Sequence, residues 1–85
     1  MMSNAEAKAM LDRIGAAQRS KGLPASCPRC GRQAMREPIH TNALSRYADC
    51  YICPDCGTDE ALRDYRGNPL PATEWSLILA MSVLN

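Results

Sequence analysis

The sequence predicts a small α+β domain: a short antiparallel β-hairpin carries two cysteine-rich turns and lies between an N-terminal helix and an apolar C-terminal helix. Three observations lead to this. The 85 residues, with no Phe, leave room for one modest core. Four of the five cysteines form two C-x-x-C pairs. Helix caps and apolar periodicity flank those pairs. We therefore expect one domain over residues 1–85, with a helical segment at 1–23, a cysteine module at 24–57 and a second helical segment at 58–85.

The N-terminal segment has the signals of an amphipathic helix. Ser3 and Glu6 are spaced as a capping box. The apolar residues that follow recur at the spacing of one helical face: Ala7, Met10, Leu11, Ile14 and Ala17. The run Gly22-Leu23-Pro24 is a typical helix stop. We expect a helix over residues 4–20.

The rest of the chain reads as two short strands followed by two helices. "RQAMREPI" (32–39) and "YADCYIC" (47–53) alternate enough for strands, and "HTNALS" between them predicts a turn or one helical turn with Asn42 as a cap. Thr58 is placed to begin a short helix at 58–65, which "RGNPLP" would end. Thr73 is placed to begin a terminal helix. That helix is apolar almost all round, so we expect it to be buried on more than one side.

The two motifs "CPRCG" (27–31) and "CPDCG" (53–57) are the strongest signal in the chain. Proline restricts φ in such a turn, and the glycine after the second cysteine permits a positive φ. Each turn offers two thiolates to one side of an ion, and two turns complete the tetrahedron that zinc prefers. The sequence thus predicts a zinc ribbon with Cys27, Cys30, Cys53 and Cys56 as ligands. The alternatives are disulfides or free thiols, or iron as in rubredoxin-like electron carriers.

The fifth cysteine, Cys50, has neither the proline nor the glycine of a metal-binding turn. Strand alternation would turn it away from Cys53, so we expect a small buried hydrophobe, with a reactive or partner-linked thiol as the alternative. His40 is expected to be an exposed turn residue rather than a ligand. Trp75 is expected to anchor the core, with an exposed interface position as the alternative.

A centre filled by four protein thiolates leaves no position for water or substrate, which indicates a structural metal and a protein that is not an enzyme. Asp59, Glu60 and Asp64 do not change this expectation. They are read as a solvated helix face that complements the helix dipole, not as acid–base groups.

Charge is distributed unevenly along the chain, although the net charge is only +1. Residues 13–46 hold seven basic residues and one acidic residue, and residues 47–64 hold five acidic residues and one basic residue. The arginines Arg29, Arg32, Arg36 and Arg46 are candidates for contact with nucleic acid. Against this, the chain lacks a basic total charge and aromatic residues interleaved with the arginines.

The stretches "CPRCG", "NALSRYADCYICPDCGTDEALRD" and "PATEWSLIL" resemble small zinc-ribbon proteins of bacterial viruses and integrated mobile elements. The likeness covers residues 27–64, with Trp75 as an outlying match. The resemblance implies the same four cysteine ligands and a small phage-type accessory protein, a class that includes regulators and inhibitors of host machinery.

The leading hypothesis is a non-catalytic, zinc-stabilised binding module that docks on a protein partner, such as a host or anti-defence target. The alternative is a nucleic-acid-binding transcriptional regulator. The chain shows neither the pattern of a signal peptide nor an apolar run long enough to span a membrane, so we expect a cytoplasmic protein without a membrane partner. The apolar terminal helix also suggests a homodimer.

Overall fold

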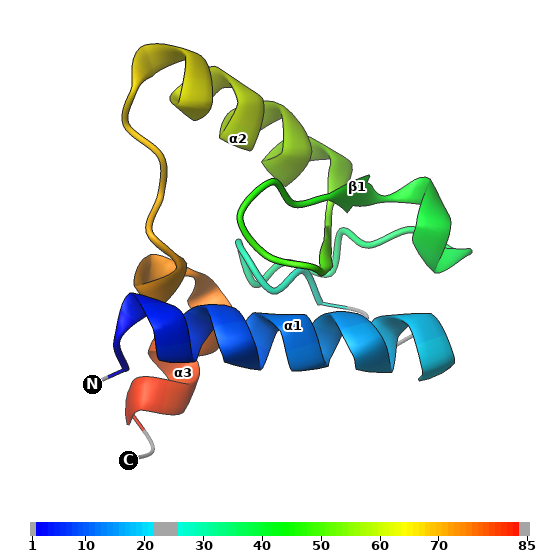
Figure 1. Cartoon of the computed structure of the whole chain (residues 1–85). Coiled ribbons are helices and arrows are strands. Elements are labelled where there is room, and N and C mark those ends of the chain that lie inside the picture. The colour runs from blue at the N-terminus through cyan, green and yellow to red at the C-terminus, as the bar shows by residue number, and fades with distance from the viewer. Residues whose placement is uncertain (1, 22–25, 84–85) are drawn as a thin grey trace.

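The computed structural model of the chain describes residues 2–21 and 26–83. Within these residues a long helix, α1 (Asn4–Lys21), is followed by the cysteine-rich loops and a two-stranded hairpin. A second helix, α2 (Pro54–Arg66), and a short third helix, α3 (Ser76–Val83), complete the fold. The loops and the hairpin lie between α1 and α2, and α3 lies near the N-terminal half of α1 (Figure 1).

Helix α1 follows the sequence prediction closely. The Ser3 amide donates to Glu6 Oε1 (3.1 Å), and the Glu6 amide donates to Ser3 Oγ (3.2 Å), which confirms the capping box. The buried side of the helix contains Ala7, Leu11, Gly15 and Gln18. The predicted stop at Gly22, Leu23 and Pro24 lies outside the described residues.

The hairpin is confirmed, but its first strand is not where the sequence placed it. Strand β1 (Ala43–Leu44) pairs antiparallel with β2 (Tyr51–Ile52), with Ala43 opposite Ile52. Residues 32–38 are an irregular loop that leads into a 3₁₀ turn, η1 (Ile39–Thr41). The prediction of a strand at 32–39 was therefore wrong.

The side chain of Asn42 provides the physical reason. Its Oδ1 accepts from the Arg36 amide and its Nδ2 donates to the Arg36 carbonyl, both at 2.8 Å. A side chain thus satisfies backbone groups that a strand would have paired with a neighbouring strand. Asn42 acts as a clamp on this loop and also donates to the carbonyl of Ile39, at the start of the 3₁₀ turn.

The free edge of β2 is covered by a side chain of α1. Gln18 Oε1 accepts from the Tyr51 amide (2.7 Å), and Gln18 Nε2 donates to the Tyr51 carbonyl (2.9 Å). Gln18 is fully buried. Its amide therefore takes the place of a third strand, and a buried polar side chain is satisfied at the same time.

Both C-terminal helices begin at other residues than predicted. Helix α2 starts at Pro54, with Cys53 as its N-cap, and Thr58 lies inside it. Gly67, with φ at 75°, ends α2 as expected. A 3₁₀ turn, η2 (Ala72–Glu74), precedes α3, so Thr73 is not a helix cap.

Trp75 is fully buried and joins Leu11, Ile52 and Ile78 in a core shared with the buried cysteines. This confirms the core-anchor prediction for Trp75. His40 is exposed, as expected. Helix α3 buries Ile78 but leaves Leu79 47% exposed. The sequence predicted that this helix is buried on more than one side, but the side that carries Leu79 is exposed.

Candidate metal centre

The two C-x-x-C turns bring four sulfur atoms together. The Sγ atoms of Cys27, Cys30, Cys53 and Cys56 all lie within 4.8 Å of one another. The Sγ atoms of Cys30 and Cys53 are 3.8 Å apart. A zinc–sulfur distance of about 2.3 Å implies a separation of about 3.8 Å between sulfurs at the corners of a tetrahedron. The four residues therefore fit a metal ion of this kind.

Each turn is closed by the same type of backbone hydrogen bond, but the glycines of the two turns have different roles. The Gly31 amide donates to the Cys27 carbonyl (2.8 Å), and the Gly57 amide donates to the Cys53 carbonyl (3.0 Å). Gly31 has φ at 80°, as the sequence predicted. Gly57 lies inside α2 without a positive φ. A Cβ there would lie 2.5 Å from the Cβ of Ala43, so Gly57 permits the close packing of β1 on α2.

Backbone amides point at the sulfurs. The Cys53 amide donates to Cys27 Sγ at 3.2 Å, and the Cys56 amide donates to Cys53 Sγ at 3.4 Å. Bonds of this kind favour the thiolate, which is the form that binds metal. Cys53 is also the N-cap of α2, so the positive end of the helix dipole faces the cluster.

The ionisation of the thiols of Cys27, Cys30 and Cys56 differs with their surroundings. Burial raises the pKa of Cys27 and of Cys56, whereas Cys30 is only half-buried. Burial also opposes ionisation of Cys30, but hydrogen bonds from the backbone and side chain of Arg32 outweigh it and lower the pKa of Cys30 to about 7. Of these three thiols, the more exposed Cys30 is thus the one that ionises first.

Cys50 is fully buried and does not belong to the cluster. Burial raises its pKa to about 12, so its thiol stays protonated near neutral pH. This confirms the expectation that Cys50 is a small buried hydrophobe.

The first turn also holds the C-terminal helix. The Ser76 amide donates to the Arg29 carbonyl (3.1 Å), and the Leu77 amide donates to the Pro28 carbonyl (3.0 Å). The first amides of a helix have no partner inside it, and here the first cysteine turn supplies carbonyl partners for the amides of Ser76 and Leu77. The position of α3, and of Trp75 just before it, therefore depends on the shape of the first C-x-x-C turn.

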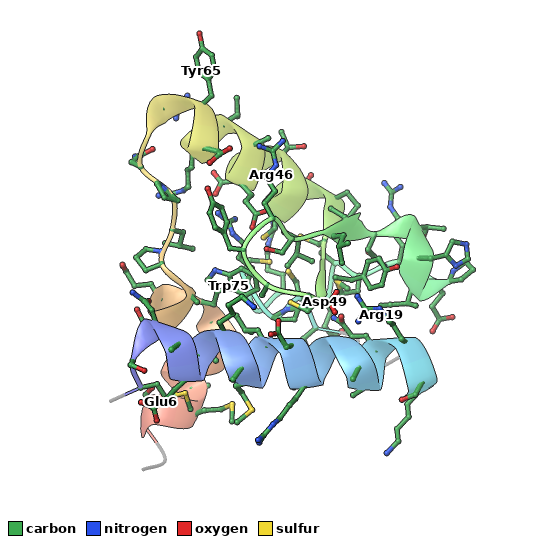
Figure 2. All side chains as sticks on the ribbon, in the orientation of Figure 1. Glu6, Arg19, Arg46, Asp49, Tyr65 and Trp75 are labelled. Carbon is green, nitrogen blue, oxygen red and sulfur yellow. The ribbon has the colours of Figure 1, made fainter. Side chains whose placement is uncertain are left out.

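The basic and acidic parts of the sequence are interleaved in space. Arg19 bonds Asp49, Arg29 bonds Asp59 (2.8 Å) and Arg46 bonds Asp64 (2.9 Å). Figure 2 shows Arg19 and Asp49 meeting above α1. These pairs join residues 18–30 positions apart, which is why charge that is segregated along the chain is mixed on the surface.

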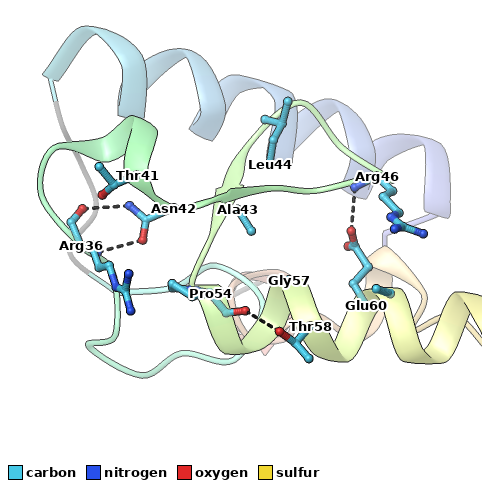
Figure 3. A pocket seen from close by; sticks show the side chains of 11 residues that line it. Arg36, Thr41, Asn42, Ala43, Leu44, Arg46, Pro54, Gly57, Thr58 and Glu60 are labelled. Carbon is cyan, nitrogen blue, oxygen red and sulfur yellow. Dashed lines mark hydrogen bonds between the residues drawn. The ribbon is translucent and has the colours of Figure 1, made fainter.

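The four arginines proposed to contact nucleic acid lie in different surroundings. Arg29 is 6% exposed and so faces the interior. Arg32 and Arg46 are exposed and lie near Asp55 (3.8 Å) and Asp64, respectively. Arg36 is exposed. Arg36 and Arg46 line a shallow groove of about 590 Å³ between β1 and α2 (Figure 3). Nucleic-acid contact by the exposed three stays a prediction.

Glu60 is a buried structural carboxylate, and the prediction that it belongs to a solvated helix face was wrong. It is 4% exposed and accepts from Ser45 Oγ and from the Arg46 amide, both at 2.7 Å. It therefore ties the end of the hairpin to α2 and is not part of a solvated face (Figure 3). No local signal in the sequence distinguishes it from its exposed neighbours Asp59 and Asp64.

No protein-family model matches the chain, and neither a curated protein nor a solved structure matches it. The likeness to phage zinc-ribbon proteins thus stays a prediction. Among the described residues, no helix is both long enough and apolar enough to cross a membrane.

Proposed function

We propose that the protein is a non-catalytic binding module whose fold is stabilised by a zinc ion held by Cys27, Cys30, Cys53 and Cys56. The observation that carries this proposal is the cluster of four sulfurs within 4.8 Å. Four protein ligands complete the coordination of a structural zinc ion and leave no position for a substrate. Such a site supplies on the order of 10 kcal/mol or more of apparent folding energy, which suits a chain with so small a core.

The partner is proposed to be a protein that contacts the outer face of α2. Leu62 is 48% exposed and Tyr65 is 91% exposed. They are three residues apart and share one side of the helix. Tyr65 projects away from the body of the molecule (Figure 2). Exposed tyrosines of this kind are frequent interface hot spots. The resemblance to phage proteins adds the idea of a host or anti-defence target.

The experiment has a metal arm and a partner arm. Elemental analysis of purified protein should give one zinc ion per chain and a colourless solution, whereas a red oxidised form would identify iron. Tagged, zinc-loaded protein should then recover a specific protein from host lysate. Tyr65→Ser should lose that protein, and Asn68→Ala, at another exposed position, should retain it.

Equal recovery by the Tyr65 variant would refute docking on this face. Recovery that disappears after nuclease treatment would favour the second candidate, a nucleic-acid-binding regulator. The observation in its favour is that exposed Arg36 and Arg46 line one groove. It predicts a salt-dependent gel shift that weakens when both arginines are replaced by alanine.

A further inference from the structure

Arg29 is a buried cation beside the cysteine cluster. Its side chain is 4% exposed, while that of its partner Asp59 is 50% exposed. Arg29 lies between the proposed ligands Cys27 and Cys30 in the chain. Its guanidinium donates to Asp59 Oδ2 (2.8 Å), which lies one helical turn beyond Cys56 in α2. Its Nε is buried without a hydrogen-bond partner among the described residues.

A salt bridge with Asp59 does not by itself explain this burial. The side chain of Asp59 is half exposed, so solvent already stabilises its charge. The desolvation of a buried ion pair often costs as much free energy as the attraction between the two charges contributes. The cluster offers a second anion. Zinc with four thiolates carries a net charge of −2, and three of its four cysteines are buried. A cation is most effective against such a charge where water is excluded.

We propose that Arg29 is a positioning residue for the metal centre: its guanidinium, oriented by Asp59, stabilises the negative charge of the thiolate cluster and thereby the metal-bound state. This inference rests on the proposed metal site. Arg32 is the natural comparison, because it stands beside Cys30 but its side chain is 62% exposed. Arg32 also favours the Cys30 thiolate, but solvent screens its charge, so we expect Arg32 to contribute less to metal binding than Arg29.

The first test compares zinc affinity by competition with a coloured chelator, using Arg29→Gln, Arg29→Lys and Arg32→Gln. Loss of a residue that supports a metal ligand typically costs 10–100-fold in affinity, and we expect this for Arg29→Gln. Arg29→Lys keeps the charge but not the fork of donors, so it should bind more tightly than Arg29→Gln. Equal affinities for these two variants would overturn the proposal, as would a larger loss for Arg32→Gln.

A readout of charge separates this role from a structural one. In protein loaded with iron, reduction of Fe³⁺ to Fe²⁺ by one electron from an electrode takes the centre from −1 to −2. Loss of a nearby cation should therefore lower the reduction potential of Arg29→Gln, and Arg29→Lys should restore it. An unchanged potential in Arg29→Gln would refute the electrostatic role.

Asp59→Asn gives a sign test that does not depend on removing the buried arginine. Charge alone predicts tighter zinc binding, because a negative group near an anionic centre becomes neutral. Orientation of Arg29 by Asp59 predicts weaker binding. Weaker binding supports the proposal, and unchanged or tighter binding overturns it. If the wild-type protein binds no metal, the proposed function fails. If the wild-type protein binds zinc and the Arg29 and Asp59 variants bind it with the same affinity, only the inference about Arg29 fails.

Discussion

Replacement of Cys53 by serine separates metal binding from every other role of this residue. Cys53 is a proposed ligand, and it is also the N-cap of α2, where its sulfur accepts from the Cys56 amide (3.4 Å). Serine is a better N-cap than cysteine, so Cys53→Ser preserves or improves the start of the helix. Any loss of folding is then due to the missing thiolate.

The expected magnitude is large. A structural zinc site contributes about 10 kcal/mol or more, and a whole domain is stable by only about 5–15 kcal/mol. Cys53→Ser should therefore lose stoichiometric zinc and leave the chain largely unfolded. Cys50→Ser is the matched control, because Cys50 is equally buried and undergoes the same change of atom. It should keep zinc and lose only about 1–3 kcal/mol, the cost of burying a hydroxyl.

Zinc content by elemental analysis and emission of the single tryptophan, Trp75, measure the two outcomes. Trp75 is fully buried, so its emission should shift to the red when the fold is lost, in Cys53→Ser and in wild-type protein treated with a chelator. A folded Cys53→Ser protein with one zinc ion would refute the assignment. A Cys50→Ser protein without zinc would refute it equally.

Further predictions concern packing, pH and assembly. A Cβ at Gly15 would lie 2.8 Å from the carbonyl carbon of Asp49. Gly15→Ala should thus lower the free energy of unfolding in denaturant by about 1–3 kcal/mol, although alanine has the higher helix propensity. Ala16→Gly at the exposed neighbouring position measures that propensity difference, and a gain in stability in Gly15→Ala would contradict the prediction. Zinc affinity should fall as the pH is lowered, because protons compete for the thiols, and Cys27 and Cys56 have a raised pKa. The fall should become steeper below about pH 7, where Cys30, with a pKa of about 7, also takes up a proton; a flat profile in chelator competition would refute this. If α3 pairs with a second copy, light scattering should give twice the chain mass, and Leu79→Lys, at a half-exposed position, should halve it; a monomeric wild type would exclude the dimer.

The features that the sequence predicted correctly depend on residues close together in the chain. The capping box of α1, the stop at Gly67 and the C-x-x-C turns each involve groups within about four positions of one another. The grouping of the four cysteines also followed from spacing, because two C-x-x-C turns together supply the four ligands of one tetrahedral ion.

Other features depend on contacts that no local pattern records. Strand β1 begins at Ala43 because Asn42 bonds the backbone of Arg36 and removes it from the sheet. The edge of β2 is closed by Gln18, a residue 33 positions away. Polar residues such as these look like surface residues until their partners are placed.

The sequence by itself determined the candidate metal ligands and the first helix, since spacing and local hydrogen bonds are enough to specify them. Only the tertiary structure decided which charges meet. It buried Arg29, a candidate for nucleic-acid contact, beside Asp59, and it buried Glu60, which was predicted on a solvated helix face, beside Ser45. The physical reason is that the cost of burying a charge depends on the anion or donor that the fold brings to it.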